Sequence, residues 1–188
     1  RMPWFAMELV VGDEPVAWGR RTDATLRQRL ELCIAICEAV QHAHDRGVIH
    51  RDLKPGNILV TVTGDGRAAP KILDFGIARD VTPGTDAALT RTGNLLGTLP
   101  YMSPEQLRGS PVLDGRADVY AIGVVLYELL TGSLPFDPDG ASWTEISRRL
   151  LEGSPPPLRS HDPALRGELE IVAQVALEKD LPRRYASP

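Results

Sequence analysis

One short stretch, residues 50–57 (His-Arg-Asp-Leu-Lys-Pro-Gly-Asn), concentrates side chains that can do chemistry. Within it, Asp52 supplies a carboxylate, Lys54 a cation two residues later, and Asn57 an amide. A second carboxylate, Asp74, follows seventeen residues after Asn57. Carboxylate and amide oxygens are the hard ligands that Mg²⁺ prefers. A base, a cation and two metal ligands are together the parts that transfer of a phosphoryl group requires.

The segments that flank this stretch predict a chain rich in helices. A Thr-x-x-Gln capping box at Thr25 opens the first long helix, whose apolar stripe runs to His44 and includes Leu26, Cys33, Ile34 and Val40. Further helices are predicted over 117–131, 143–151 and 165–178. The first of these carries Glu128 as the only charge between residues 119 and 130. Such a helix is expected to be buried on every side.

Three short strands are predicted over 3–11, 58–62 and 71–73. The last two are separated by a turn with Gly64 and Gly66, which indicates a hairpin directly after the polar stretch. Residues 77–105 instead show little apolar periodicity and many Thr and Gly. A stretch of that length without regular structure is typically functional in a compact domain.

Composition excludes several classes of protein. The 188 residues are 43% hydrophobic, with a net charge of −4 and a mean hydropathy of −0.14, which excludes disordered, collagen-like and disulfide-scaffold chains. Without a basic footprint, we expect no nucleic-acid partner. The longest apolar run, 119–127, falls far short of the roughly 18 residues of a membrane span, so no membrane contact is expected within this segment.

Two cysteines and two histidines share the first long helix. Cys33 and Cys37 are expected to be buried free thiols, because no cluster of His or Cys supplies further metal ligands. Unpaired thiols suit a reducing compartment. His42 and His44 are expected to be packing or surface residues rather than a metal site.

Taken together, the motifs resemble those of the eukaryotic-type (Hanks-type) serine/threonine protein kinases, including the bacterial members. After residues 50–57 the chain carries, in the family's order, Asp74-Phe75-Gly76, Gly97-Thr98, Ser103-Pro104-Glu105, Asp118 and Arg184. The resemblance implies an α+β, protein-kinase-like fold: a mostly α-helical C-lobe with a short β-hairpin at the catalytic face, and an N-lobe that is largely absent. It implies one partial kinase domain over 1–188, with the end of the N-lobe and the hinge in 1–12, the C-lobe in 13–188 and the activation segment in 74–105.

The resemblance also implies catalytic roles. Asp52 would be the base for the substrate hydroxyl, and Lys54 would neutralise charge on the γ-phosphate. Asn57 and Asp74 would hold Mg²⁺ against the phosphates of ATP, so the implied cofactors are ATP and Mg²⁺. The Leu-Lys-Pro sequence around Lys54 favours Ser or Thr over Tyr as the acceptor.

ATP would extend from these groups to the first predicted strand. Backbone groups of Glu8 and Val10, at the family's hinge after Met7, would bind adenine, and Leu59 would pack under the ring. Lys54, Asn57 and Asp74 would contact the phosphates and their metal.

Other residues would hold the site in place. His50 and Phe75 would stack into the core, and Asp118 would tie the backbone of His50 and Arg51 to the buried helix. Glu105 and Arg184, separated by most of the chain, resemble the family's buried ion pair.

The activation segment offers regulatory candidates. Arg51, beside the base, is the natural partner for a phosphate on this segment, and Thr90 and Thr92 are the favoured acceptors because they flank Arg91 near the substrate end. Thr98 is expected to hydrogen-bond near Asp52 and Lys54 instead.

Two parts of a complete kinase have no match in the sequence. No Gly-x-Gly-x-x-Gly loop and no strand lysine occur, so we expect an excerpt whose residues 1–188 alone transfer negligible phosphate. Implied partners are proteins that present Ser or Thr, with self-association for autophosphorylation. The implied location is cytoplasmic, with any membrane anchor elsewhere in the full protein. Alternatives are a pseudokinase that serves as a scaffold module and a small-molecule phosphotransferase of kinase-like fold.

Overall fold

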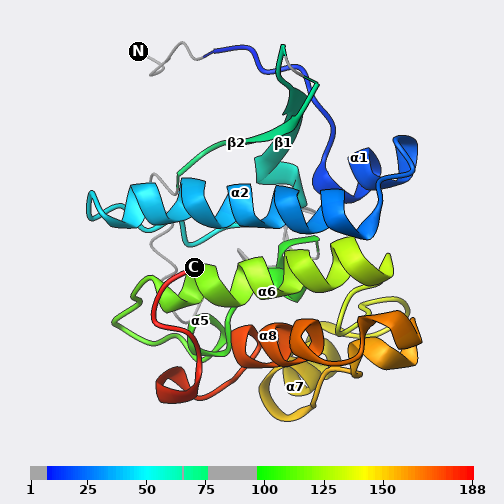
Figure 1. Ribbon diagram of the computed structural model, residues 1–188. Coiled ribbons are helices and arrows are strands. Elements are labelled where there is room, and N and C mark those ends of the chain that lie inside the picture. The colour runs from blue at the N-terminus through cyan, green and yellow to red at the C-terminus, as the bar shows by residue number, and fades with distance from the viewer. Residues whose placement is uncertain (1–7, 65, 76–96) are drawn as a thin grey trace.

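The computed structural model describes residues 8–64, 66–75 and 97–188 (Figure 1). Its α-helices are α1 (Pro15–Arg21), α2 (Leu26–His44), α5 (Pro104–Leu107), α6 (Arg116–Thr131), α7 (Trp143–Glu152) and α8 (Glu168–Ala176). Its strands are β1 (Ile58–Val62) and β2 (Ala68–Ile72). Single 3₁₀ turns span Pro55–Asn57, Leu99–Tyr101, Leu158–Ser160, Pro163–Leu165 and Leu181–Arg183.

The two strands form the predicted antiparallel hairpin, which lies against α2 (Figure 1). Leu59 pairs with Lys71 and Val62 with Ala68, so β2 begins three residues before the predicted strand. Ile58 and Val60 are buried, while Leu59 between them is half-buried, in keeping with the alternation of a strand that has one face on a core. The hairpin therefore anchors the end of the polar stretch to the helical body.

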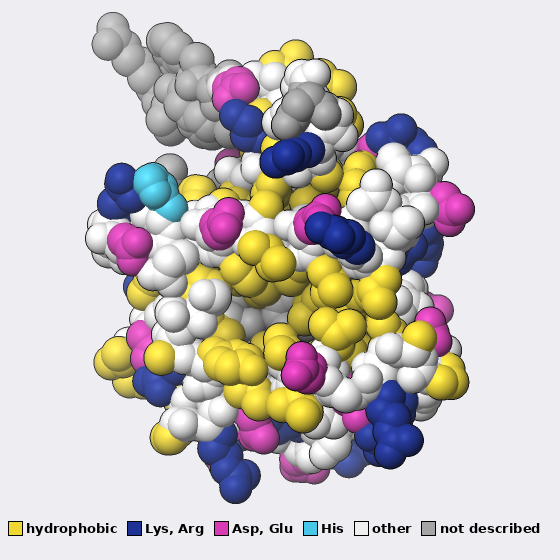
Figure 2. All heavy atoms as spheres, viewed as in Figure 1, with side chains coloured by type: hydrophobic (Ala, Val, Ile, Leu, Met, Phe, Trp, Pro, Cys, Tyr) yellow, Lys and Arg dark blue, Asp and Glu magenta, His cyan; other side chains and the backbone are white. Residues whose placement is uncertain are grey.

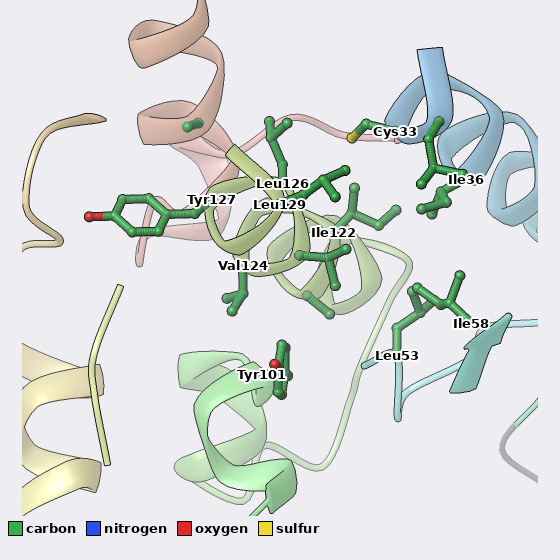
Figure 3. Packing of buried hydrophobic residues seen from close by; sticks show 14 of the residues in the cluster. Cys33, Ile36, Leu53, Ile58, Tyr101, Ile122, Val124, Leu126, Tyr127 and Leu129 are labelled. Carbon is green, nitrogen blue, oxygen red and sulfur yellow. The ribbon is translucent and has the colours of Figure 1, made fainter. Parts of the chain in front are cut away.

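Helix α6 is the centre of the molecule, as its apolar sequence predicts. It lies between α2 and α8, and Figure 3 shows Ile122, Leu126 and Leu129 among side chains of the surrounding elements. Cys33 and Ile36 of α2 and Leu53 of the polar stretch belong to the same buried cluster. Fully burying a Leu or Ile side chain contributes about 1.5–3 kcal/mol, so this cluster makes α6 a firm support for the loops attached to it.

The predicted stripe on α2 is partly wrong. Leu32 and Ile36 are buried with Cys33 and Val40, whereas Ile34 is 58% exposed and Leu26 is 39% exposed. Figure 2 shows apolar side chains gathered in the hollow below α2 on the face viewed, and exposed apolar residues of α8 include Ile171 and Val172. The apolar residues of α2 thus occupy more than one side of the helix, and periodicity alone did not reveal which side faces α6.

The strand predicted over 3–11 is also wrong where the structure describes it. Residues 8–11 form no strand, and Leu9 and Val11 are 88% and 83% exposed. A single bridge joins Asp13 to Val60 of β1. The apolar sequence there indicated a strand, but the described residues pair with the hairpin only at Asp13. Residues 3–7 lie outside the described part of the chain.

Both cysteines of α2 are free thiols, with Cys33 buried and Cys37 half-buried. The described residues contain no cluster of three or more His, Cys, Asp or Glu side chains arranged to hold a metal ion. Within the same residues, no helix combines the length and the apolar character that crossing a membrane demands.

Gly123 allows α8 to approach α6 closely. A Cβ at this position would lie 2.9 Å from the Cβ of Ala176 and 3.3 Å from its carbonyl carbon. We expect Gly123→Ala to lower the free energy of unfolding by about 1–3 kcal/mol, because neither helix can yield without moving its backbone. Thermal unfolding followed by circular dichroism measures the change.

Gly19 in α1 offers a matched control, since a Cβ there would stay 3.6 Å from its nearest neighbours. Gly19→Ala should be neutral or stabilise by up to about 1 kcal/mol through helix propensity. An equal shift of both variants would contradict the role assigned to the α6–α8 contact.

Candidate active site

Three polar side chains form a connected network around Asp52. The Lys54 ammonium nitrogen lies 3.2 Å from Oδ2 of Asp52 and donates to the hydroxyl of Thr98 at 2.7 Å. Asn57 donates its Nδ2–H to the carbonyl of Asp52 at 2.7 Å and lies 3.3 Å from its Oδ2. Asp52 and Lys54 keep 21% of their side chains exposed, so a substrate can reach them. The expected contact of Thr98 with Lys54 is confirmed.

The orientation of Asn57 determines which of its atoms is available to a ligand. Because Nδ2 faces Asp52, the amide oxygen points to the other side of the group. A backbone bond from Leu73 N to Asn57 O, 2.9 Å long, joins this loop to the segment that carries Asp74. Asp74 is exposed. The amide oxygen and the carboxylate are both hard oxygen donors on adjoining segments, which suits Mg²⁺.

His50 connects the two segments through its ring. Its Nε2–H donates to the carbonyl of Leu73 at 2.8 Å, which leaves Nδ1 to accept the backbone N–H of Asp52 at 3.3 Å. The ring of Phe75 lies 5.0 Å away, centroid to centroid, at a tilt of 51°. One buried imidazole thus fixes the backbone beside both candidate carboxylates, Asp52 and Asp74.

Asp118, in the first turn of α6, holds the start of this loop. Its Oδ2 accepts the backbone N–H of His50 and its Oδ1 accepts that of Arg51, each at 2.8 Å. The carboxylate is 1% exposed, so these bonds replace the water it has lost. The loop is therefore attached to the helix that the core holds most firmly.

His44 is a third partner of Asp118 that sequence reasoning missed. Its Nε2 lies 2.8 Å from Asp118 Oδ2, and its side chain is 11% exposed. Gly115 makes room for the ring, since a Cβ there would lie 2.8 Å from two of the ring atoms. The residues are 74 positions apart, and no local pattern in the sequence links them.

Glu105 and Arg184 form a buried, two-pronged ion pair. Nη1 and Nη2 of Arg184 lie 2.7 and 3.1 Å from the two carboxylate oxygens of Glu105. Arg184 also donates to the carbonyls of Glu178 and Arg116, each at 2.8 Å, and its guanidinium lies over the ring of Tyr120. Through these bonds the pair joins α5 to α6 and to the chain after α8. Removing one partner of such a pair costs about 3–5 kcal/mol.

Comparison with known proteins now adds to this geometry. A family model described as "Protein kinase domain" matches residues 2–184. The chain belongs to the protein kinase family. It is 41% identical to serine/threonine-protein kinase Pkn1 of Myxococcus xanthus, over 98% of this chain and 26% of that protein. It is 36% identical to serine/threonine-protein kinase PknJ of Mycobacterium tuberculosis, over 98% of this chain and 31% of that protein.

The protein kinase fold is shared with solved structures as well. The crystal structure of a Mycobacterium tuberculosis PknI kinase-domain mutant matches with a TM-score of 0.63 and 28% identity, over 96% of this chain and 59% of that one. The kinase-like fold expected from the sequence is thus confirmed. The chain spans about a quarter to a third of the length of the curated relatives just named.

The hinge residues expected from the family lie next to the hairpin. Glu8 is exposed and its carboxylate lies 3.5 Å from the ammonium nitrogen of Lys71 in β2. Val10 and Leu59 are both half-buried. The close approach of Gly12 to β1, where a Cβ would lie 2.6 Å from the Val60 carbonyl oxygen, keeps this segment beside the hairpin. The regulatory candidates Thr90 and Thr92 lie outside the described residues.

A second contact missed by sequence reasoning joins the 3₁₀ turn Leu99–Tyr101 to α6. The Tyr101 hydroxyl donates to Oε2 of Glu128 at 2.6 Å. Burial raises the pKa of Glu128, and the bond from Tyr101 opposes that shift. Glu128 stood out in the sequence as a lone charge on an apolar helix, which was a signal that it needed a partner.

The raised pKa of Glu128 predicts a pH-dependent stability. A carboxyl that holds its proton more tightly in the folded protein stabilises it fully at a pH below the ordinary value of 4.5. That contribution is lost as the pH rises through the raised pKa. Relative to Glu128→Gln, the wild-type protein should therefore lose free energy of unfolding as the pH rises from below 4.5 through the raised pKa of Glu128. Urea titrations at several pH values measure the difference.

Tyr101→Phe provides the control, because it removes the bond that lowers the pKa of Glu128. In that background the difference in stability between the protein that keeps Glu128 and its Glu128→Gln variant should depend more steeply on pH. A difference that stays constant with pH would contradict the burial effect.

Proposed function

We propose that the protein containing this chain is a serine/threonine protein kinase. It transfers the γ-phosphoryl group of ATP to Ser and Thr hydroxyls of protein substrates. The observation that carries the proposal is the network joining Asp52, Lys54, Asn57 and Thr98, which puts a carboxylate, an ammonium group and an amide on one surface. Membership of the kinase family and relatives named as serine/threonine kinases support it.

Asp52 acts as the base in this proposal. Its Oδ2 lies between Lys54 and Asn57, at 3.2 and 3.3 Å, which holds the carboxylate in one orientation. A base must lie within hydrogen-bond reach of the proton that it accepts. The partial exposure of Asp52 leaves room for a substrate hydroxyl to approach it.

Lys54 and the proposed metal ligands, Asn57 and Asp74, offset the negative charge of the ATP phosphates. The Lys54 ammonium, oriented by Thr98, neutralises charge that develops on the transferred phosphoryl group. The amide oxygen of Asn57 and the carboxylate of Asp74 would hold Mg²⁺, which supplies charge neutralisation to the phosphates when bound. Backbone groups of Glu8 and Val10, with Leu59, bind the adenine of ATP.

The same proposal assigns the parts of the domain. Residues 1–12 form the end of the N-lobe and the hinge, 13–188 the C-lobe, and 74–105 the activation segment. The side chain of Arg51 binds a phosphate on Thr90 or Thr92. Its exposure, beside the base, supports this role.

Asp52→Asn tests the assignment of the base in the protein at its full natural length. The turnover number should fall by a factor of about 10² to 10⁴, because the proton loses its acceptor. Affinity for ATP with Mg²⁺ should stay unchanged, since Asn57 and Asp74 remain. Phosphoamino-acid analysis of the wild-type products should show phosphoserine or phosphothreonine without phosphotyrosine.

Asp139→Asn makes the same chemical change at an exposed residue and serves as the control. This variant should keep wild-type turnover. ATP binding without transfer to any protein would instead indicate a scaffold module. Transfer to small alcohols but not to proteins would indicate a small-molecule phosphotransferase.

A further inference from the structure

Two hydrogen bonds fix the backbone of Arg51, the residue before Asp52, one at its N–H and one at its carbonyl. Arg51 has a φ of +65°, a left-handed conformation that non-glycine residues rarely adopt. Such a residue keeps this conformation only when its surroundings fix it. Its N–H donates to Asp118 Oδ1 at 2.8 Å, and its carbonyl accepts from Nε2 of Gln106 at 2.7 Å. The carbonyl belongs to the same peptide group as the N–H of Asp52.

The side-chain amide of Gln106 is oriented by its other end. Its Oε1 accepts from the backbone N–H of Ser103 at 3.0 Å and from the Ser103 hydroxyl at 3.1 Å. These contacts form the capping box of α5. With the oxygen committed to Ser103, the NH₂ group is directed at Arg51, and this orientation satisfies both neighbours.

Helix α5 is itself firmly placed. Glu105, next to Gln106, makes the buried ion pair with Arg184. The chain just before α5 contains Thr98, which accepts from Lys54. Arg51, Asp52, Gln106 and Asp118 also line one small cavity together. The α5 region therefore meets residues 50–57, the proposed catalytic loop, at Lys54 and again at Arg51.

We propose that Gln106 is a positioning residue for the catalytic base. Its Nε2–H fixes the strained Arg51 carbonyl and thereby the peptide that carries Asp52. The position of the base then depends on the position of α5, at the end of the proposed activation segment. This role rests on the proposed kinase function, while the hydrogen bond itself does not.

A role in helix capping alone makes a different prediction. Glu serves as well as Gln at the third helical position of a capping box, because only the side-chain oxygen is needed. Gln106→Glu keeps that oxygen for Ser103 and replaces the donor that faces Arg51. Capping alone therefore predicts no effect, and positioning predicts a loss of turnover.

The chain contains a matched control in α2. Gln28 forms the same capping box with Thr25, through bonds of 2.9 and 3.0 Å to its Oε1. This box lies at an exposed helix end, away from the catalytic loop (Figure 1). Gln28→Glu makes the identical chemical change there.

The experiment compares wild type, Gln106→Glu, Gln106→Met and Gln28→Glu in the protein at its full natural length. Steady-state kinetics, thermal unfolding and hydrogen exchange of the Asp52 amide are measured for each. Gln106→Glu should lower kcat about fivefold with unchanged KM for ATP and an unchanged melting temperature. It should also speed exchange of the Asp52 amide about as much. Gln28→Glu should match wild type in all three.

Gln106→Glu both removes the N–H donor and places a negative charge beside Arg51. Gln106→Met tests which of the two changes matters, because it removes the donor without adding a charge. This variant also lacks the oxygen that caps α5. Since Gln106→Glu keeps that oxygen, a similar fall in kcat in both variants supports positioning by the amide. Wild-type kcat or wild-type exchange of the Asp52 amide in Gln106→Glu would overturn the proposal. If the wild-type protein transfers no phosphate, the proposed function fails, whereas unchanged exchange of the Asp52 amide in Gln106→Glu overturns the positioning role.

Discussion

The buried carboxylate of Asp118 is the group on which the arrangement of the candidate active site depends. It receives hydrogen bonds from the backbone of His50 and Arg51 and has the His44 ring 2.8 Å away, with only 1% of its side chain exposed. A carboxylate taken out of water is tolerable only when donors surround it. The cost of burying Asp118 therefore holds residues 50–57 against the first turn of α6, which the core fixes in place.

Hydrogen bonds to the backbone connect this anchored loop to the segment that carries Asp74. The ring of His50 donates to the carbonyl of Leu73, and the N–H of Leu73 donates to the carbonyl of Asn57. Asp52 and Asp74, 22 positions apart, are thus held by neighbouring segments. Precision at exposed, charged side chains comes from neutral contacts behind them, because surface ion pairs alone contribute little.

Local sequence patterns made part of the fold and of the candidate site predictable. The capping box at Thr25, the hairpin after Asn57 and the buried character of α6 follow from residues within one or two turns of each other. The polar set of residues 50–57 could be identified because it is contiguous. His44 and Gln106 could not, because their partners lie 74 and 55 positions away. Ile34 was misplaced because the neighbours of a helix, not its own periodicity, decide which apolar face is covered.

The two buried carboxylates of the site, Asp118 and Glu105, serve folding and function together. Breaking the buried ion pair of Glu105 costs about 3–5 kcal/mol, against a typical net stability of about 5–15 kcal/mol. Removing the carboxylate of Asp118 would leave two backbone N–H groups without their acceptor. Changes at either carboxylate would therefore alter the fold before they reported on catalysis. Gln106 is different, because its bond to Arg51 is exposed and its loss leaves both carboxylates paired. Partly exposed side chains of this kind are where the position of a catalytic base can be adjusted while the core stays intact.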